Sequence, residues 1–376
     1  MQLPRLAIVH EWFTGMRGGE KCVEALCELF PDASLFTLVH RRGSVSPTIE
    51  RMPLTTSFIQ RLPLAGSRYR HYLPLFPLAV QRFDLREFDC VLSSHHCVAK
   101  GVRTPPHALH LCYCYTPMRY LWDQYDEYFG PGRAGMPTRL AMRLARGPMR
   151  RWDVRTASNP HAFIAISEHV RRRIRTIYQR QADLIYPPVD TGFYGLSTRN
   201  EGWFLMVSAL VPYKRVDLAI AACNATGERL VIAGDGPEMT RLRALAGPTV
   251  SFTGWVSDQD VRELYGGCAA VLFPGEEDFG IVPLEAMASG KPVIALARGG
   301  ALETVLEGPA VTTGVLFAEP TVESLVEALR SFRSREFDAS ALRRFALGFD
   351  REVFKARMRR YIQEHWEAFS PGRPQL

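Results

Sequence analysis

Two glutamates eight residues apart, Glu277 and Glu285, enclose a glycine turn and the start of a short predicted helix. The helix is predicted over Pro283–Ala288, because proline suits the first turn, where it has no N–H to lose and its φ is already helical. An apolar run at 293–296 predicts a buried strand behind it. A helix N-terminus that follows a glycine favours phosphate, whereas carboxylates repel phosphate and grip hydroxyls. Carboxylates beside such a turn therefore indicate a cradle for a nucleotide sugar.

Composition limits the classes of protein that this chain can be. Its 376 residues are 47% hydrophobic and 23% charged, which is ordinary for a folded protein of two domains. No apolar run approaches the roughly 18 residues that span a bilayer, and the N-terminal stretch Met1–Arg5 has no secretory core, so we expect a cytoplasmic protein. The eight cysteines are scattered without a C-x-x-C; Cys112 and Cys114 lie in an apolar run and are expected to be core thiols, not metal ligands.

The net charge of +7 is unevenly distributed along the chain. Residues 1–190 carry 26 Lys and Arg against 16 Asp and Glu, whereas residues 191–376 carry 20 against 23. A basic first half predicts contact with an anionic surface. No nucleic-acid-binding motif accompanies the charge, so we expect no nucleic-acid partner.

Strands and helices are predicted to alternate through both halves, which is typical of parallel sheets with crossover helices. In the first half, strands are expected at 5–10, 88–93, 108–113 and 162–166, with a turn at 14–19, a helix at 20–30 and a helix from Ser167. The segment Tyr186–Asp190 contains two consecutive prolines and is expected to end the first domain. After it, strands are expected at 203–207, 229–233, 250–253 and 270–274 and helices at 214–223, 237–245 and 258–265. We therefore predict two Rossmann-like domains, residues 1–192 and 201–349, that face each other across a ligand-binding cleft. A helix over 350–369, within a segment 350–376, is expected to return to the first domain.

Several short signatures occur together in the second half: Val211–Arg215 with Lys214, Gly234–Glu238, Gly254–Asp258 and Glu277–Glu285. In this order and spacing the chain resembles family 4 retaining glycosyltransferases of the GT-B fold over nearly the whole second domain. The first half also resembles these enzymes, in four short segments: Gly18-Gly19, Val98–Gly101, Thr116–Tyr120 and Ile166–Val170. With 279–283 and 299–304, they resemble bacterial GDP-mannose-dependent mannosyltransferases that assemble O-antigen and exopolysaccharide.

The resemblance implies roles for individual residues. Lys214, with Arg215, would support the diphosphate without any metal ion, because a departing nucleoside diphosphate needs fixed positive charge. Glu285 would bind the ribose and Glu277 the hexose. The remaining predicted donor contacts are Gly18, Gly19, Trp255, Val256, Phe279, Gly280, Ile281 and Val282; Tyr115 joins Glu277 and Lys214 as a catalytic candidate, and Arg119 and Trp122 are acceptor candidates.

Plainer interpretations stay open for several of these residues. The two glutamates would also suit a helix dipole, Lys214 a solvated helix start, and Gly18-Gly19 a tight turn. Asp258-Gln259-Asp260 spells the D-x-D of metal-dependent glycosyltransferases, but we expect Asp258 to cap the helix that follows.

The chain departs from the family pattern at two positions. Many members have an arginine five residues before the lysine, where this chain has Ala209, so Arg215 is a candidate substitute. Relatives often have a histidine where this chain has Tyr115, and a phenol is a poor base at neutral pH. His95, His96 and His110 are candidates for the missing role, and the sequence does not choose among them.

Two basic and apolar segments of the first half, residues 61–76 and 136–152, suggest contact with an anionic membrane. A polyprenyl-diphosphate-linked glycan acceptor would lie at the inner membrane, so we expect peripheral association there. The alternative is an exposed helix with an ordinary charged face.

We therefore expect a glycosyltransferase that moves mannose from GDP-mannose. Two alternatives stay open: a nucleotide-sugar epimerase or hydrolase of the same fold, and a non-catalytic glycosyltransferase-like subunit. A nicotinamide oxidoreductase is disfavoured, because the first turn lacks G-x-G-x-x-G.

Overall fold

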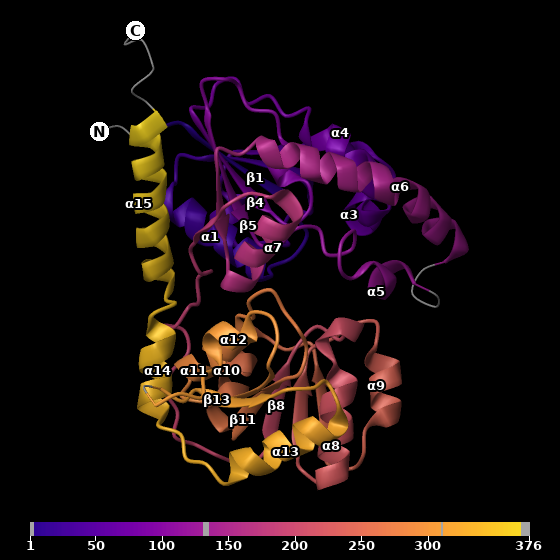
Figure 1. Ribbon diagram of the computed structural model, residues 1–376, viewed down its shortest axis with the longest axis vertical. Coiled ribbons are helices and arrows are strands. Elements are labelled where there is room, and N and C mark those ends of the chain that lie inside the picture. The colour runs from indigo at the N-terminus through magenta and orange to yellow at the C-terminus, as the bar shows by residue number, and fades with distance from the viewer. Residues whose placement is uncertain (1–3, 131–134, 310, 370–376) are drawn as a thin grey trace. The chain divides into compact units, whose positions relative to one another are not determined.

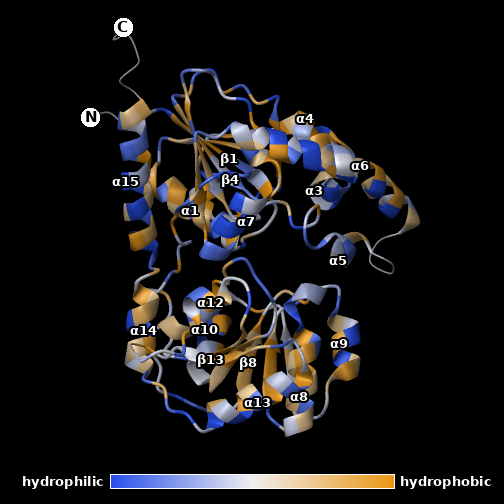
Figure 2. Cartoon of the chain, in the orientation of Figure 1, coloured by the Kyte–Doolittle hydropathy of each residue, from blue (hydrophilic) through white to orange (hydrophobic). Residues whose placement is uncertain are grey.

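The computed structural model describes residues 4–130, 135–309 and 311–369, which form two α/β units (Figure 1). Unit 1 comprises Met1–Pro188 and Phe354–Leu376, and unit 2 comprises Val189–Val353. Residues 1–3, part of the N-terminal stretch considered above, and 370–376, the end of the expected C-terminal segment, lie outside the described residues. Figure 2 shows apolar strands inside each unit and helices of mixed hydropathy around them.

Unit 1 is built on a seven-stranded sheet of order β3-β2-β1-β4-β5-β6-β7, with every pair parallel. The strands are β1 Leu6–Phe13, β2 Ser34–His40, β3 Leu54–Thr56, β4 Cys90–His95, β5 Leu109–Cys114, β6 Ala162–Ala165 and β7 Asp183–Leu184. The central strands β4 and β5 are buried along their whole length, which is why they read as apolar runs.

The helices of unit 1 are mostly short, apart from α1, α6, α7 and α15. They are α1 Gly18–Leu29, α2 Pro47–Glu50, α3 Ala65–Arg68, α4 Phe76–Val80, α5 Tyr125–Phe129, α6 Met136–Arg155, α7 Glu168–Tyr178 and α15 Arg351–Phe369, with 3-10 turns η1 Phe58–Arg61, η2 Tyr69–Leu75, η3 Ala99–Gly101 and η4 Thr156–Ser158.

Unit 2 has a six-stranded parallel sheet of order β10-β9-β8-β11-β12-β13. Figure 1 shows α8 and α13 on one face of this sheet and α10, α11 and α12 on the other. The strands are β8 Phe204–Val207, β9 Leu230–Ala233, β10 Val250–Gly254, β11 Ala270–Phe273, β12 Val293–Leu296 and β13 Gly314–Phe317. The helices are η5 Pro212–Lys214, α8 Val216–Thr226, α9 Met239–Leu245, α10 Asp258–Gly267, α11 Val282–Ala288, α12 Ala301–Thr304, α13 Val322–Arg333 and α14 Ala339–Leu347.

The α/β class with two Rossmann-like parallel sheets is confirmed, as is the return of the C-terminal helix to unit 1. In α15, Lys355 Nζ lies 3.2 Å from Glu28 Oε2, and the Tyr361 hydroxyl donates to Asp183 Oδ2 at 2.7 Å. The units divide at 188/189, a few residues before the expected end of the first domain at 192. The reason is that Val189 exchanges backbone hydrogen bonds with Phe349 and Arg351 of unit 2.

Three local expectations are corrected by the structure. Gly18 and Gly19 begin α1 instead of lying in a turn before it. Lys214 ends the 3-10 turn η5, and α8 starts only at Val216, because Arg215 has φ +53° and separates the two. The helix expected over 237–245 begins at Met239.

Candidate functional site

The Lys214–Glu277 ion pair lies where the strand order of unit 2 reverses. Strands β8 and β11 are neighbours in the sheet but not in the chain, and the loop after β8 carries Lys214 while the loop after β11 carries Glu277. Lys214 Nζ donates to Glu277 Oε1, and both side chains are slightly exposed, at 17% and 18%. In open parallel sheets, ligands bind at the carboxyl ends of the strands at such a reversal. The structure therefore brings two predicted site residues together at the expected ligand-binding edge.

Close backbone packing places the lysine at this edge. A Cβ on Gly275 would lie 2.6 Å from the Tyr213 carbonyl oxygen and 2.9 Å from Lys214 Cα, so only glycine allows the two loops to approach. The left-handed conformation of Arg215 is costly for a residue with a side chain, and such strain concentrates at functional sites. Arg215 Nε lies 3.3 Å from Asp217 Oδ1, so its guanidinium has a partner of its own beside the pair.

Glycines also fix the loop that carries Glu277. Gly280 has φ +85°, and a Cβ there would lie 2.6 Å from the Phe273 ring. The Gly300 N–H donates to the Glu277 carbonyl at 2.8 Å, and a Cβ on Gly299 would lie 2.3 Å from that oxygen. The two signatures quoted from the sequence, 277–285 and 299–304, thus pack against each other and hold the carboxylate in place.

Glu285 lies on α11 and is buried. Its Oε2 accepts a hydrogen bond of 3.0 Å from the hydroxyl of Tyr265, which is fully buried. Burial, and then the Glu285 carboxylate, raise the pKa values of both Tyr265 and Tyr194 well above the ordinary range. Both phenols therefore stay protonated, and Tyr265 holds the carboxylate as a donor.

Four of the other donor contacts predicted for unit 2, residues 279–282, lie between Glu277 and Glu285 in the sequence. Ile281 caps α11 and Val282 begins it, after the buried Phe279. Trp255 follows β10, two strands away from β8, and its side chain is 79% exposed. No hydrogen bond or ring contact joins Trp255 to the Lys214–Glu277 pair among the described residues, so its assignment to the base, with Val256, stays a prediction.

The expectation that Asp258 caps α10 is wrong by one residue. Ser257 is the N-cap: its Oγ accepts from the Asp260 N–H at 3.2 Å, and the Asp260 carboxylate accepts from the Ser257 N–H at 3.1 Å. This reciprocal capping box occupies Asp260. Within the described part of the chain, no three His, Cys, Asp or Glu residues are grouped as metal ligands would be.

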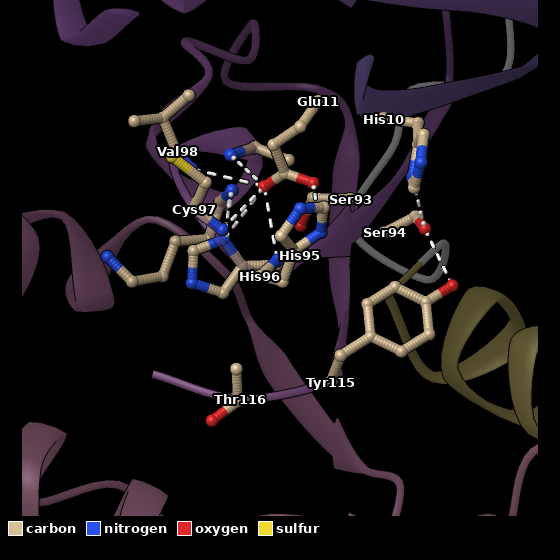
Figure 3. Close-up of polar contacts among 12 residues, drawn as sticks. His10, Glu11, Ser93, Ser94, His95, His96, Cys97, Val98, Tyr115 and Thr116 are labelled. Carbon is tan, nitrogen blue, oxygen red and sulfur yellow. Dashed lines mark hydrogen bonds and ion pairs between the residues drawn. The ribbon is translucent and has the colours of Figure 1, made fainter. Parts of the chain in front are cut away.

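In unit 1, Tyr115 is held by hydrogen bonds to its neighbours (Figure 3). Its hydroxyl donates to the Gly19 carbonyl at 3.1 Å and lies 2.9 Å from Ser94 Oγ, which in turn lies 2.9 Å from His10 Nδ1. Burial raises the pKa of Tyr115 well above its ordinary value. Tyr115 therefore stays a neutral phenol that fastens the start of α1, where Gly18 and Gly19 lie.

The acceptor candidates are less open than the sequence implied. The indole N–H of Trp122 donates to Asp153 Oδ2 at 2.8 Å, and the guanidinium of Arg150 lies 4.7 Å from the Trp122 ring centre. The Arg119 carbonyl accepts from the N–H groups of Asp123 and Gln124. The polar atom of Trp122 is thus occupied by the protein itself.

The sequence analysis missed Glu11, which is fully buried near the end of β1. Its Oε1 accepts from the backbone N–H groups of residues 96–99 at 2.8–3.1 Å, and its Oε2 lies 3.0 Å from His96 Nδ1. Of the three histidines considered above, only His96 is open to solvent, at 28%; His95 and His110 are buried. The signal in the sequence was the pair His10-Glu11 inside an otherwise apolar strand.

The family comparison concerns unit 2. Residues 196–346, which include Lys214, Glu277 and Glu285, match the family described as Glycosyl transferases group 1. The chain is 36% identical over 183 residues to the GDP-mannose-dependent alpha-mannosyltransferase of Mycobacterium tuberculosis (strain CDC 1551 / Oshkosh), which covers 48% of this chain and 42% of the relative. It is 36% identical over 105 residues to Sulfoquinovosyl transferase SQD2 of Arabidopsis thaliana, 27% of this chain and 21% of that protein. In both cases the match spans less than half of the relative's length.

Solved structures resemble nearly the whole chain. Anabaena Alr3699/HepE in complex with UDP-glucose has a TM-score of 0.68 at 16% identity, over 96% of this chain and 99% of that chain. The likeness shows the fold, which is the GT-B type expected from the sequence. Within the described residues, no helix combines the length and the hydrophobicity that crossing a bilayer requires.

Proposed function

We propose that this chain is a retaining glycosyltransferase that moves mannose from GDP-mannose to a polyprenyl-diphosphate-linked glycan during surface polysaccharide assembly. The observation that carries the proposal is the Lys214–Glu277 pair at the strand reversal of unit 2, inside the segment that matches Glycosyl transferases group 1. An ammonium group and a carboxylate at a ligand-binding edge suit a substrate that presents both phosphate and hydroxyl groups.

The proposed reaction assigns a task to each charged group. The bond between the sugar's anomeric carbon and the phosphate oxygen breaks, and a bond from that carbon to an acceptor oxygen forms on the same face. The acceptor's proton passes to the departing phosphate. Lys214 supports the charge that grows on this diphosphate, Glu277 grips hexose hydroxyls, and Glu285, held by Tyr265, accepts from the ribose hydroxyls.

Two lines of support favour a mannose donor. The signatures quoted from the sequence resemble those of mannosyltransferases, and one of the relatives named above uses GDP-mannose by its name. The name of the Arabidopsis relative and the UDP-glucose in the Anabaena structure point to other donors. The choice of GDP-mannose therefore rests on the sequence signatures and on the name of the Mycobacterium relative.

Unit 1 has the charge and the surface for an acceptor at an anionic membrane. Met136, Leu140 and Leu144 recur every four residues on α6 and are 76%, 62% and 72% exposed. Arg139 and Arg143 lie between them along the helix. An apolar stripe with adjacent arginines suits the interface of an anionic bilayer, so we place the inner-membrane contact on this face of α6.

The test is a transfer assay with the purified chain, a panel of GDP-mannose, UDP-glucose and ADP-glucose, and bacterial lipid extract as acceptor. We expect labelled sugar in the lipid fraction from GDP-mannose alone. Transfer from UDP-glucose alone would overturn the mannose assignment. Sugar release at full rate without any lipid would favour a hydrolase, and no turnover with any donor would favour a non-catalytic subunit.

A further inference from the structure

The strand reversal of unit 1 carries a second pair of carboxylate and cation, Glu11 and His96. In this sheet the order reverses between β1 and β4, which are neighbours. Glu11 lies near the carboxyl end of β1, and His96 follows β4 directly. Figure 3 shows the two side chains meeting beside Tyr115 and Ser94. Ligands of open parallel sheets bind at the carboxyl ends of the strands where the strand order reverses, so we expect unit 1 to bind a ligand at this edge.

Glu11 is built into the protein as a fixed anchor. It is 1% exposed, and four successive backbone N–H groups, from His96 to Ala99, donate to its Oε1. Burial alone would raise the pKa of Glu11, but His96 and His95 outweigh burial and lower it well below its ordinary value. The carboxylate is therefore ionised at neutral pH and holds the residues that follow β4 in one conformation.

His96 is oriented by this carboxylate. Its Nδ1 faces Glu11 Oε2 at 3.0 Å, and its ring lies edge-on to Trp12 with centroids 4.7 Å apart. No hydrogen bond to its Nε2 is found among the described residues, and 28% of the side chain is exposed. Because the carboxylate of Glu11 fixes Nδ1, the ring is held in one orientation and its Nε2–H can donate to a ligand, as in histidines that a carboxylate orients for binding.

The charge of His96 follows from the groups that face it. Burial lowers the pKa of His96, but the carboxylates of Glu11 and Glu20 outweigh both burial and Arg70 and raise it above its ordinary value. Of the polar groups beside it, His10 Nδ1 and Tyr115 share Ser94, His10 Nε2 is buried 3.9 Å from Glu20 Oε1, and the buried His95 Nδ1 lies 3.5 Å from Glu11. His96 is thus the histidine of this group that reaches solvent, and its surroundings favour the charged ring.

We propose that His96, positioned by Glu11, binds a phosphate oxygen of a substrate through its Nε2–H. The inference rests on the proposed function and adds to it a binding residue from unit 1. A diphosphate is offered by two substrates of the proposed reaction: the nucleotide and the polyprenyl-diphosphate acceptor. The chemistry is shared, so the experiment must distinguish the two sources.

The first test follows the imidazole itself. In the full-length protein, the ¹H–¹³C NMR signal of His96 is assigned by its absence from His96→Gln and titrated with pH, with and without inorganic pyrophosphate. We expect pyrophosphate to raise the pKa of His96, because an anion favours the charged ring. A titration curve that pyrophosphate leaves unmoved overturns the proposal. This readout needs no turnover, so it holds whether or not the chain transfers sugar.

The second test separates the sources by measuring dissociation constants of GDP and of polyprenyl diphosphate in detergent at pH 6.5. Loss of a charge-assisted hydrogen bond should weaken one of them about tenfold to a hundredfold in His96→Gln. Loss for GDP assigns the donor, and loss for the lipid assigns the acceptor. Unchanged affinity for both overturns the proposal.

His40→Gln is the matched control. It breaks another histidine–glutamate pair of unit 1, His40 Nε2 to Glu50 Oε1 at 3.1 Å, and should leave both affinities at the wild-type value. If wild-type protein binds neither GDP nor the lipid but pyrophosphate still shifts His96, the proposed function fails and the anion site stands.

Discussion

The two sheets place a carboxylate and a cation at the same topological position but use different chemistry. In unit 2 the pair is Lys214 and Glu277, both slightly exposed and carried by loops. In unit 1 the pair is His96 and Glu11, and the carboxylate is fully buried. An imidazole titrates within the physiological range, so the charge at the unit 1 edge depends on pH.

The largest difference between the two edges should appear when the carboxylate of unit 2 is removed. Glu277→Gln should reduce kcat by about 100-fold, because the proposed hydrogen bonds to the hexose hydroxyls, which would tighten in the transition state, are lost. Stability should change by less than about 1 kcal/mol, since the ion pair with Lys214 is partly solvated. Initial rates and urea unfolding measure the two effects. A rate within twofold of wild type would remove Glu277 from the site.

Removing the carboxylate of unit 1 should act on stability instead. Glu11→Gln should lower the free energy of unfolding by about 2 kcal/mol at pH 7, because a buried anion that accepts four N–H groups becomes a neutral amide. The control is Glu50→Gln, which leaves the partner of His40 neutral at a more exposed position.

The pH dependence of this loss has a definite sign. Because folding lowers the pKa of Glu11, its ionised carboxylate stabilises the fold at pH values above the pKa that this carboxyl group has in the unfolded chain. This stabilisation is lost as the pH falls through the lower pKa of the folded state. Because folding raises the pKa of His96, its charged imidazole stabilises the fold at pH values below the pKa that it has in the unfolded chain. This stabilisation is lost as the pH rises through the higher pKa of the folded state. The difference between wild type and Glu11→Gln should therefore be largest between these limits. Urea unfolding from pH 4 to 9 measures it, and a constant difference would show that the pair is not coupled.

The sequence predicted unit 2 better than unit 1, for a physical reason. In unit 2, Glu277, Gly280 and Glu285 lie within nine residues of one another, so one motif singled them out, whereas Lys214 lies 63 residues before Glu277 and was assigned through the family resemblance. In unit 1, Glu11 and His96 are 85 residues apart along the chain and meet only because β1 and β4 are neighbours. Strand order is a tertiary property that local patterns do not carry. Strands β2, β3, β7 and β13 were not predicted; β3 and β7 have only three and two residues, too few to show a pattern.

Tyr265→Phe tests whether Tyr265 positions Glu285 for its proposed contact with the ribose. The change removes one donor from the buried Glu285 without altering the ring, so nucleotide affinity should fall about fivefold, or about 1 kcal/mol. Tyr361→Phe removes a similar phenol–carboxylate bond to Asp183 in unit 1 and should leave the affinity unchanged. Calorimetric titration with GDP compares the two variants. Equal affinity of Tyr265→Phe and wild type would mean that Tyr265 does not position Glu285.

The smallest expected effect comes from adding charge to unit 2. Ala209 is exposed in the loop after β8, at the position where many of the glycosyltransferases that the chain resembles have an arginine. Ala209→Arg would add a cation to the loop that already carries Lys214 and Arg215, and an exposed charge contributes only about 0.5 kcal/mol, so GDP affinity should rise about twofold. Ala209→Gln matches most of the length without the charge and should have no effect. The gain should shrink as salt is raised, because ions screen exposed charges; a gain that persists in 1 M salt would come from contact and not from charge.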